Sequence, residues 1–130
     1  MAFYIDTSAL AKLVVAESET GSLRAWFAEA DREPVACDVV RAELMRAVRR
    51  AAPDRVMQAR AVLDSITLTE VTATLFEQAG RLDPPTLRSL DAVHLAAALD
   101  LGDDLSGFVT YDDRLAQAAT ANGIKVISPR

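Results

Sequence analysis

Short apolar runs and longer amphipathic runs alternate along the chain from residue 2 to residue 128. Runs of about five mostly apolar or β-branched residues predict buried strands, and longer runs with apolar residues three or four apart predict helices. The predicted strands are 2–5, 33–38, 67–71, 107–111 and 125–128. The predicted helices are 8–17, 20–31, 38–51, 55–66, 72–82, 89–102 and 113–122. Ser8 is the predicted N-cap of the first helix. This alternation predicts an α/β fold: a mostly parallel sheet of four or five strands flanked by helices.

Aspartates follow two of the predicted strands. Asp6 comes directly after strand 2–5, and Asp112 and Asp113 follow strand 107–111. In open parallel sheets, ligands bind outside the carboxyl ends of the strands. The sequence therefore predicts carboxylates at the edge of the sheet where a site is expected, although aspartate is also typical of turns and helix N-caps.

Two further acids lie on predicted helices. Glu43 borders the apolar stripe of helix 38–51, and Asp91 opens helix 89–102, which is apolar almost all round. Each also has an ordinary structural interpretation. Glu43 could pair with Arg46 at i,i+3, and Asp91 could be a first-turn acid that the helix dipole favours.

A cluster of Asp6, Glu43, Asp91 and Asp112 would be costly without a cation. Two carboxylates about 4 Å apart repel by roughly 4 kcal/mol at an effective dielectric constant of 20. Ligands that are all oxygen suit Mg²⁺ or Mn²⁺ better than zinc. If the four acids converge, they predict a site for one of these metals.

Four segments near these acids also match a known pattern in their order and spacing. They are FYIDTSAL, VVRAELMRA, SLDAVHLAAA and FVTYDDRLAQAA. Together they resemble the four blocks of PIN-domain ribonucleases, with the closest likeness to the VapC toxins of bacterial toxin–antitoxin pairs. The resemblance spans nearly the whole chain and implies a single PIN-like nuclease domain over residues 1–130. Residues 53–88 match only loosely, so the choice of RNA target is not carried over.

The resemblance implies a Mg²⁺-dependent endoribonuclease, with Mn²⁺ as an alternative metal. Metal-activated water would hydrolyse the phosphodiester bond, so no protein nucleophile is required. The implied catalytic and metal-binding residues are Asp6, Glu43, Asp91 and Asp112. The implied supporting residues are Thr7 and Ser8, whose hydroxyls would orient Asp6 or a bound water, and Thr110, which would do the same beside Asp112. Asp113 is the alternative to Asp112, although it is better suited to the first turn of the following helix.

The implied partners are an RNA substrate, a VapB-like antitoxin and a second copy of the chain. The net charge of −5 at first argues against RNA, but residues 41–60 contain six arginines and only two acids. Arg46, Arg49 and Arg50 are therefore candidate RNA contacts. An ordinary solvated basic face is the alternative.

His94 and Cys37 are the remaining residues with reactive side chains. A lone histidine on an apolar helix is more often a core residue than a catalytic base, so His94 is predicted to pack. Cys37 lies in a predicted buried strand and has no partner for a disulfide, which favours a reducing compartment such as the cytoplasm. No basic leader and no uncharged apolar run of about 18 residues are present, which predicts neither secretion nor membrane insertion.

Two other classes of function remain as alternatives. One is a PIN-like binding module that has lost catalysis, although such a protein would be expected to lack at least one of the acids. The other is a phosphoryl-transfer or receiver-type α/β domain. That class normally needs a lysine near the phosphate, and neither Lys12 nor Lys125 follows a predicted strand.

Overall fold

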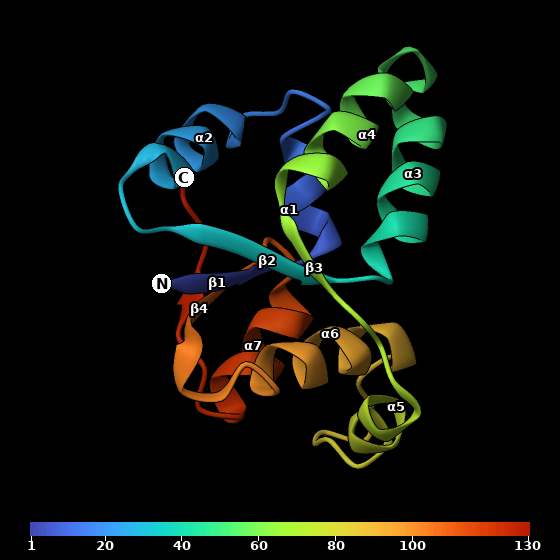
Figure 1. The fold of residues 1–130 in the computed structure, drawn as a ribbon, viewed down its shortest axis with the longest axis vertical. Coiled ribbons are helices and arrows are strands. Elements are labelled where there is room, and N and C mark those ends of the chain that lie inside the picture. The colour runs from blue at the N-terminus through green and yellow to red at the C-terminus, as the bar shows by residue number, and fades with distance from the viewer.

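A five-stranded parallel sheet forms the centre of the protein, as described by a computed structural model of residues 1–130 (Figure 1). The strands are β1 (Ala2–Ile5), β2 (Glu33–Cys37), β3 (Thr67–Thr69), β4 (Leu105–Val109) and β5 (Val126–Ile127). Their order is β3-β2-β1-β4-β5, and every neighbouring pair is parallel. The predicted α/β fold is confirmed.

Seven α-helices cover the two faces of this sheet. They are α1 (Thr7–Lys12), α2 (Thr20–Ala28), α3 (Val40–Ala51), α4 (Val56–Ser65), α5 (Ala73–Gly80), α6 (Ser89–Leu99) and α7 (Asp113–Ala121). Helices α1 to α4 lie on one face and α5 to α7 on the other (Figure 1). Two 3₁₀ turns, Pro53–Arg55 and Gly102–Asp104, precede α4 and β4. None of the helices combines the length and apolar character needed to cross a bilayer.

The central strand β1 is buried against both helical layers. Tyr4 and Ile5 have no exposed surface, and neither have Phe108 and Val109 on the neighbouring strand β4. Gly107 in β4 is needed for close packing, since a Cβ there would lie 2.6 Å from Cδ1 of Ile127. Because β1 lies between β2 and β4, its carboxyl end is enclosed by other chain segments on both sides.

The predicted start of the first helix is wrong. Helix α1 begins at Thr7, and its N-cap is Asp6 rather than Ser8, because the Asp6 carboxylate accepts the Ala9 N–H. The helix ends at Lys12 instead of residue 17. The Thr20 hydroxyl donates to the Lys12 carbonyl at 2.7 Å and so satisfies a carbonyl at the end of the helix.

Two other boundaries bear on the candidate site. Strand β4 begins two residues before the prediction and ends at Val109, which leaves Thr110 outside the strand. Helix α6 ends at Leu99 rather than residue 102, and Gly102 follows in the left-handed region with φ 57°. The remaining elements lie where the hydrophobic pattern predicts them, with ends that differ by at most three residues.

Candidate active site

Four acidic side chains come to the carboxyl-end edge of the sheet from four different segments. Asp6 follows β1, Glu43 and Asp91 lie in the first turns of α3 and α6, and Asp112 caps α7. The Asp6 N–H donates to the Val109 carbonyl at 3.2 Å, so the ends of β1 and β4 lie side by side. The predicted location of these acids at one sheet edge therefore agrees with the fold.

Asp6 is held rigidly in a buried position. Only 3% of its surface is exposed, and its Oδ1 accepts hydrogen bonds from the Ser8 hydroxyl at 2.7 Å and the Ala9 N–H at 3.1 Å. Its Oδ2 accepts from the Thr110 hydroxyl at 2.6 Å. Burial raises the pKa of Asp6 above its ordinary value, although all three hydrogen bonds act in the opposite direction. Ser8 orients Asp6 as predicted.

Thr110 links Asp6 to Asp112. Its hydroxyl donates to Asp6 and accepts the Asp112 N–H at 3.0 Å. The Asp112 Oδ1 accepts the N–H groups of Arg114 and Leu115 at 3.0 and 3.1 Å, which makes Asp112 the N-cap of α7. Asp6 and Asp112 are thus both helix N-caps. In each of them only Oδ1 caps the helix, while Oδ2 contacts another side chain, Thr110 for Asp6 and Arg88 for Asp112. Thr110 supports both acids, and not Asp112 alone.

Glu43 has a different partner from the one expected. No ion pair joins it to Arg46; instead its Oε1 accepts from the Thr7 hydroxyl at 2.7 Å and from His94 Nε2 at 2.5 Å. Thr7 therefore orients Glu43 and not Asp6, because α1 packs directly against α3. The Oε2 atom of Glu43 has no hydrogen-bond partner, so it is free to accept a ligand.

His94 is buried, as predicted, but it also contacts the site. Only 2% of its surface is exposed, and its Nδ1 lies 2.7 Å from the Tyr4 hydroxyl, which accepts the Cys37 N–H at 3.2 Å. Burial alone would raise the pKa of Glu43, but the hydrogen bond and charge of His94, with Thr7, lower it. The sequence contains a signal for this contact, because His94 is the only polar residue within the apolar stretch 92–98 and a buried polar side chain needs a hydrogen-bond partner.

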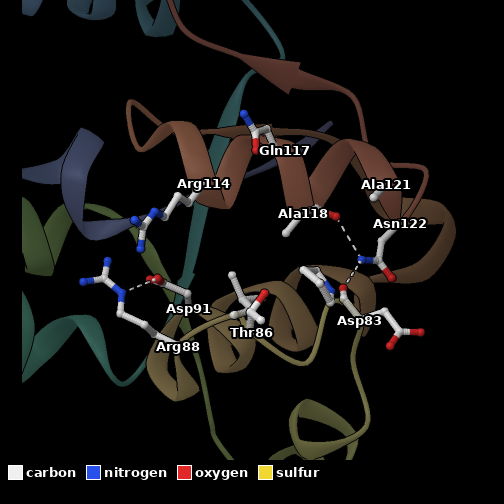
Figure 2. Close-up of a pocket in the computed structure, with 11 residues that line it drawn as sticks. Asp83, Thr86, Arg88, Asp91, Arg114, Gln117, Ala118, Ala121 and Asn122 are labelled. Carbon is white, nitrogen blue, oxygen red and sulfur yellow. Dashed lines mark hydrogen bonds and ion pairs between the residues drawn. The ribbon is translucent and has the colours of Figure 1, made fainter.

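Arg88 bridges the two remaining acids. Its Nε donates to Asp91 Oδ2 at 3.1 Å, and its Nη2 lies 3.5 Å from Asp112 Oδ2. Figure 2 shows the guanidinium group directed toward Asp91. The Arg88 side chain is 69% exposed. Sequence reasoning missed Arg88, although its position directly before helix α6 and three residues before Asp91 was a usable signal for an ion pair.

The other candidate residues lie outside these contacts. Asp113 is an exposed first-turn acid of α7 that makes no ion pair, whereas Asp112 faces Arg88. Arg46, Arg49 and Arg50 are exposed on the later turns of α3, where their side chains line a shallow, open hollow of about 240 Å³. They form a basic face that continues along α3 from Glu43.

The arrangement of the acids bears on whether they fit a metal ion. No three acidic, histidine or cysteine side chains are grouped closely enough to hold one as they lie. However, Glu43 Oε2 and Asp91 Oδ1 have no partner, and Asp112 Oδ2 has only Arg88. Hard carboxylate oxygens suit Mg²⁺ or Mn²⁺, and a positive group already lies between two of the acids. The donor chemistry fits a divalent cation, provided that Asp91 and Asp112 release Arg88.

Comparisons with known proteins bear on the family. The PIN domain family model matches residues 3–121. The chain is 42% identical to ribonuclease VapC47 of Mycobacterium tuberculosis (strain CDC 1551 / Oshkosh), over 97% of this chain and 96% of that protein. Its fold is similar to the crystal structure of M. tuberculosis VapC20, a sarcin–ricin loop cleaving toxin, with a TM-score of 0.79. The two sequences are 21% identical, and the match covers 98% of this chain and 99% of VapC20. A toxin–antitoxin complex from Klebsiella pneumoniae has a similar chain, with a TM-score of 0.71 and 20% identity over 100% of this chain and 98% of that one.

Proposed function

The chain belongs to the PIN-domain family, and on this basis we propose that it is a metal-dependent endoribonuclease that acts as the toxin of a toxin–antitoxin pair. The observation that carries the proposal is the set of four acids, Asp6, Glu43, Asp91 and Asp112, at one edge of the sheet in a chain of this family. All four are present, which favours an active nuclease over a binding module that has lost catalysis.

The four acids are proposed to hold Mg²⁺, or Mn²⁺ in its place. When bound, the metal supplies Lewis-acid chemistry, by which water becomes a nucleophile at neutral pH and negative charge on the phosphate is offset. The chain's own part is to present carboxylate oxygens in fixed directions. Ser8 and Thr110 fix Asp6, while Thr7 and His94 fix Glu43 through one oxygen and leave its other oxygen free.

RNA is proposed to approach over the basic face of α3. Arg46, Arg49 and Arg50 are exposed and make no ion pairs, so their charges are available to phosphate groups. Arg88 is positioned to neutralise Asp91 and Asp112 until the metal is bound, which keeps repulsion within the acidic cluster low. The acidic net charge of the chain is therefore compatible with a nucleic-acid substrate.

The proposed protein partners are a VapB-like antitoxin and a second copy of the chain. The proposal is supported by the similarity of the chain to a component of the toxin–antitoxin complex from K. pneumoniae. The receiver-type alternative lacks support, because the Lys12 ammonium group is paired with Glu17 and Glu19 and not with a site acid.

The proposed activity can be tested with the purified chain, freed of any partner and incubated with total cellular RNA and Mg²⁺ or Mn²⁺. We expect discrete cuts that disappear with EDTA and in the Asp91→Asn variant. Asp103→Asn is the matched control, because Asp103 is an exposed acid in the Gly102–Asp104 turn that makes no ion pair. Cutting by Asp91→Asn at the wild-type rate would exclude the proposed site. No cutting by any form would favour the silent binding module.

A further inference from the structure

A cavity outside the cluster of acids opens next to Asp91. Its volume is about 770 Å³, within the range of sites that bind small molecules or parts of polymers. The walls are the segment before α6, the start of α6 and one side of α7 (Figure 2). Arg88 and Asp91 belong to the lining, so the cavity is continuous with the proposed active site.

One wall contact is structural and fixes the width of the cavity. The Asn122 side-chain amide donates to the Asp83 carbonyl at 3.1 Å and to the Ala118 carbonyl at 2.9 Å. These hydrogen bonds tie the segment before α6 to the end of α7. The Asn122 donor is therefore occupied, and the opposite walls are held apart at a set distance.

Three other polar side chains of the lining have no partner. The Arg114 guanidinium, the Gln117 amide and the Thr86 hydroxyl make no hydrogen bond or ion pair within the chain. In Figure 2, Arg114 and Arg88 extend toward the end of the cavity where Asp91 lies. The lining thus offers an unpaired cation close to the acids and an unpaired amide one turn further along α7.

This order of groups matches the chemistry of a nucleotide. A guanidinium group binds the two oxygens of a phosphodiester, and a carboxamide can donate to and accept from the edge of a base at once. The hydroxyl of Thr86 suits the ribose 2′-OH, and Leu87 and Ala121 provide apolar surface for the sugar or base. No aromatic residue lines the cavity, so recognition would depend on base edges and not on stacking.

We propose that this cavity binds the nucleotide that adjoins the cleaved phosphodiester, with Arg114 holding its phosphate and Gln117 selecting its base. The inference rests on the proposed ribonuclease function, because a polynucleotide held at Asp91 must continue on at least one side of the cut. Gln117 is then a specificity-determining residue and Arg114 a phosphate contact that does not depend on sequence, and neither is needed for metal binding.

The first test measures RNA binding without cleavage. Full-length Asp6→Asn protein, with Arg114→Ala or Gln117→Ala added, is titrated with fluorescein-labelled single-stranded RNA 12-mers of random sequence, and the bound RNA is sequenced. Arg114→Ala should raise Kd about 5- to 10-fold for all sequences and lower the slope of log Kd against log salt by about 1. Gln117→Ala should reduce the preference for one base at one position by about 5- to 100-fold.

The second test maps cleavage ends in total RNA with the Gln117→Ala and Arg114→Ala variants in the otherwise native chain. Arg55→Ala and Gln58→Ala are matched controls, since both residues lie near the start of α4 and line none of these cavities. Gln117→Ala should relax the base next to the cut, whereas the controls should cut as the wild type does.

The outcomes separate this inference from the proposed function. If both cavity variants bind and cut RNA with wild-type affinity and preference while Asp91→Asn is inactive, the nuclease stands and the cavity does not bind RNA. The same result would be expected if the cavity receives a protein segment. If no RNA is cut by any form, the nuclease proposal fails, and unchanged RNA binding by Arg114→Ala would overturn the cavity proposal as well.

Discussion

The four acids form two pairs that are held in different ways. The inner pair, Asp6 and Glu43, is fixed by hydroxyl groups, a backbone N–H and His94. The outer pair, Asp91 and Asp112, is bridged by Arg88, which is largely exposed. Hydrogen bonds from buried or part-buried donors hold a carboxylate in one orientation, whereas an exposed ion pair contributes little and exchanges readily. The comparison indicates that the inner pair is preorganised. In the outer pair, Oδ1 of Asp112 is fixed by the backbone of α7, and only the oxygens that contact Arg88 are adjustable.

The largest effect is expected from the inner pair. Asp6→Asn should reduce RNA cleavage at least about 100-fold, since the carboxylate is fixed at the centre of the site. Without added metal, its melting temperature should equal or exceed that of the wild type, because burial disfavours the ionised carboxylate. Mg²⁺ should raise the melting temperature of the wild type more than that of the variant. Cleavage assays and thermal unfolding with and without Mg²⁺ provide the measurements.

Asp113→Asn is the control for this substitution, because Asp113 is an exposed acid outside both pairs. It should cleave RNA at close to the wild-type rate. An inactive Asp113→Asn together with an active Asp112→Asn would mean that the outer pair has been assigned to the wrong aspartate.

The second-largest effect on cleavage is expected from His94, which supports Glu43 of the inner pair. His94→Gln should lower cleavage about 10- to 100-fold, because the orientation of Glu43 depends on the buried Nε2 donor. It should also destabilise the fold by about 1–3 kcal/mol, because the buried Tyr4 hydroxyl loses one of its two partners and keeps only the Cys37 N–H. Urea unfolding and single-turnover cleavage measure the two effects separately.

Tyr4→Phe separates positioning from packing. It removes the hydroxyl beside His94 but keeps the ring, so cleavage should fall less than in His94→Gln. If the two variants lose cleavage in proportion to their loss of stability, His94 acts only through packing, and the distinction between a preorganised and an adjustable pair loses its support.

A smaller effect is expected at the outer pair. Arg88→Gln should bind Mg²⁺ about 2- to 5-fold more tightly than the wild type, because Asp91 and Asp112 no longer have to release a cation. Isothermal titration without RNA measures this affinity. Arg114→Gln is the control, since its side chain lines the same cavity and contacts neither acid. Weaker Mg²⁺ binding by Arg88→Gln would show that Arg88 supports the metal site and does not compete with it.

The smallest effect is expected on the basic face of α3. Arg46→Gln and Arg50→Gln should each weaken RNA binding a few-fold for all sequences and lower the salt slope by about 1. Arg55→Gln is the control on the next element. A change confined to one RNA sequence would indicate base recognition there, which is the role proposed for the cavity beside α7.

The fold and the sheet edge with its acids could be predicted from the sequence because both depend on regular patterns. Burial on both faces makes the strands of a parallel sheet short continuous apolar runs, helices show a period of 3.6, and parallel strands direct their carboxyl ends to one edge. Asp6 and Asp112 could be assigned to this edge because each directly follows the end of an apolar run. Element ends were less predictable: α1 was expected to begin one residue late because the capping role of Asp6 was assigned to Ser8.

The partners of the site residues could not be predicted in the same way. The Thr7 hydroxyl lies next to Asp6 in the sequence but donates to Glu43, 36 residues away, because of how α1 meets α3. Arg88 reaches Asp112 across 24 residues by means of a long flexible side chain. Such contacts depend on the relative placement of whole elements, about which local spacing carries no information.

The order of the strands has a consequence for synthesis of the protein. Strand β1 is made first, but its neighbour β4 begins about 100 residues later, and Asp112 follows β4. A growing chain on the ribosome therefore carries Asp6 and Glu43 long before the complete set is present, and no product that stops before residue 112 contains all four acids. For a protein that acts on RNA, this order delays the assembly of its active site until the chain is nearly finished.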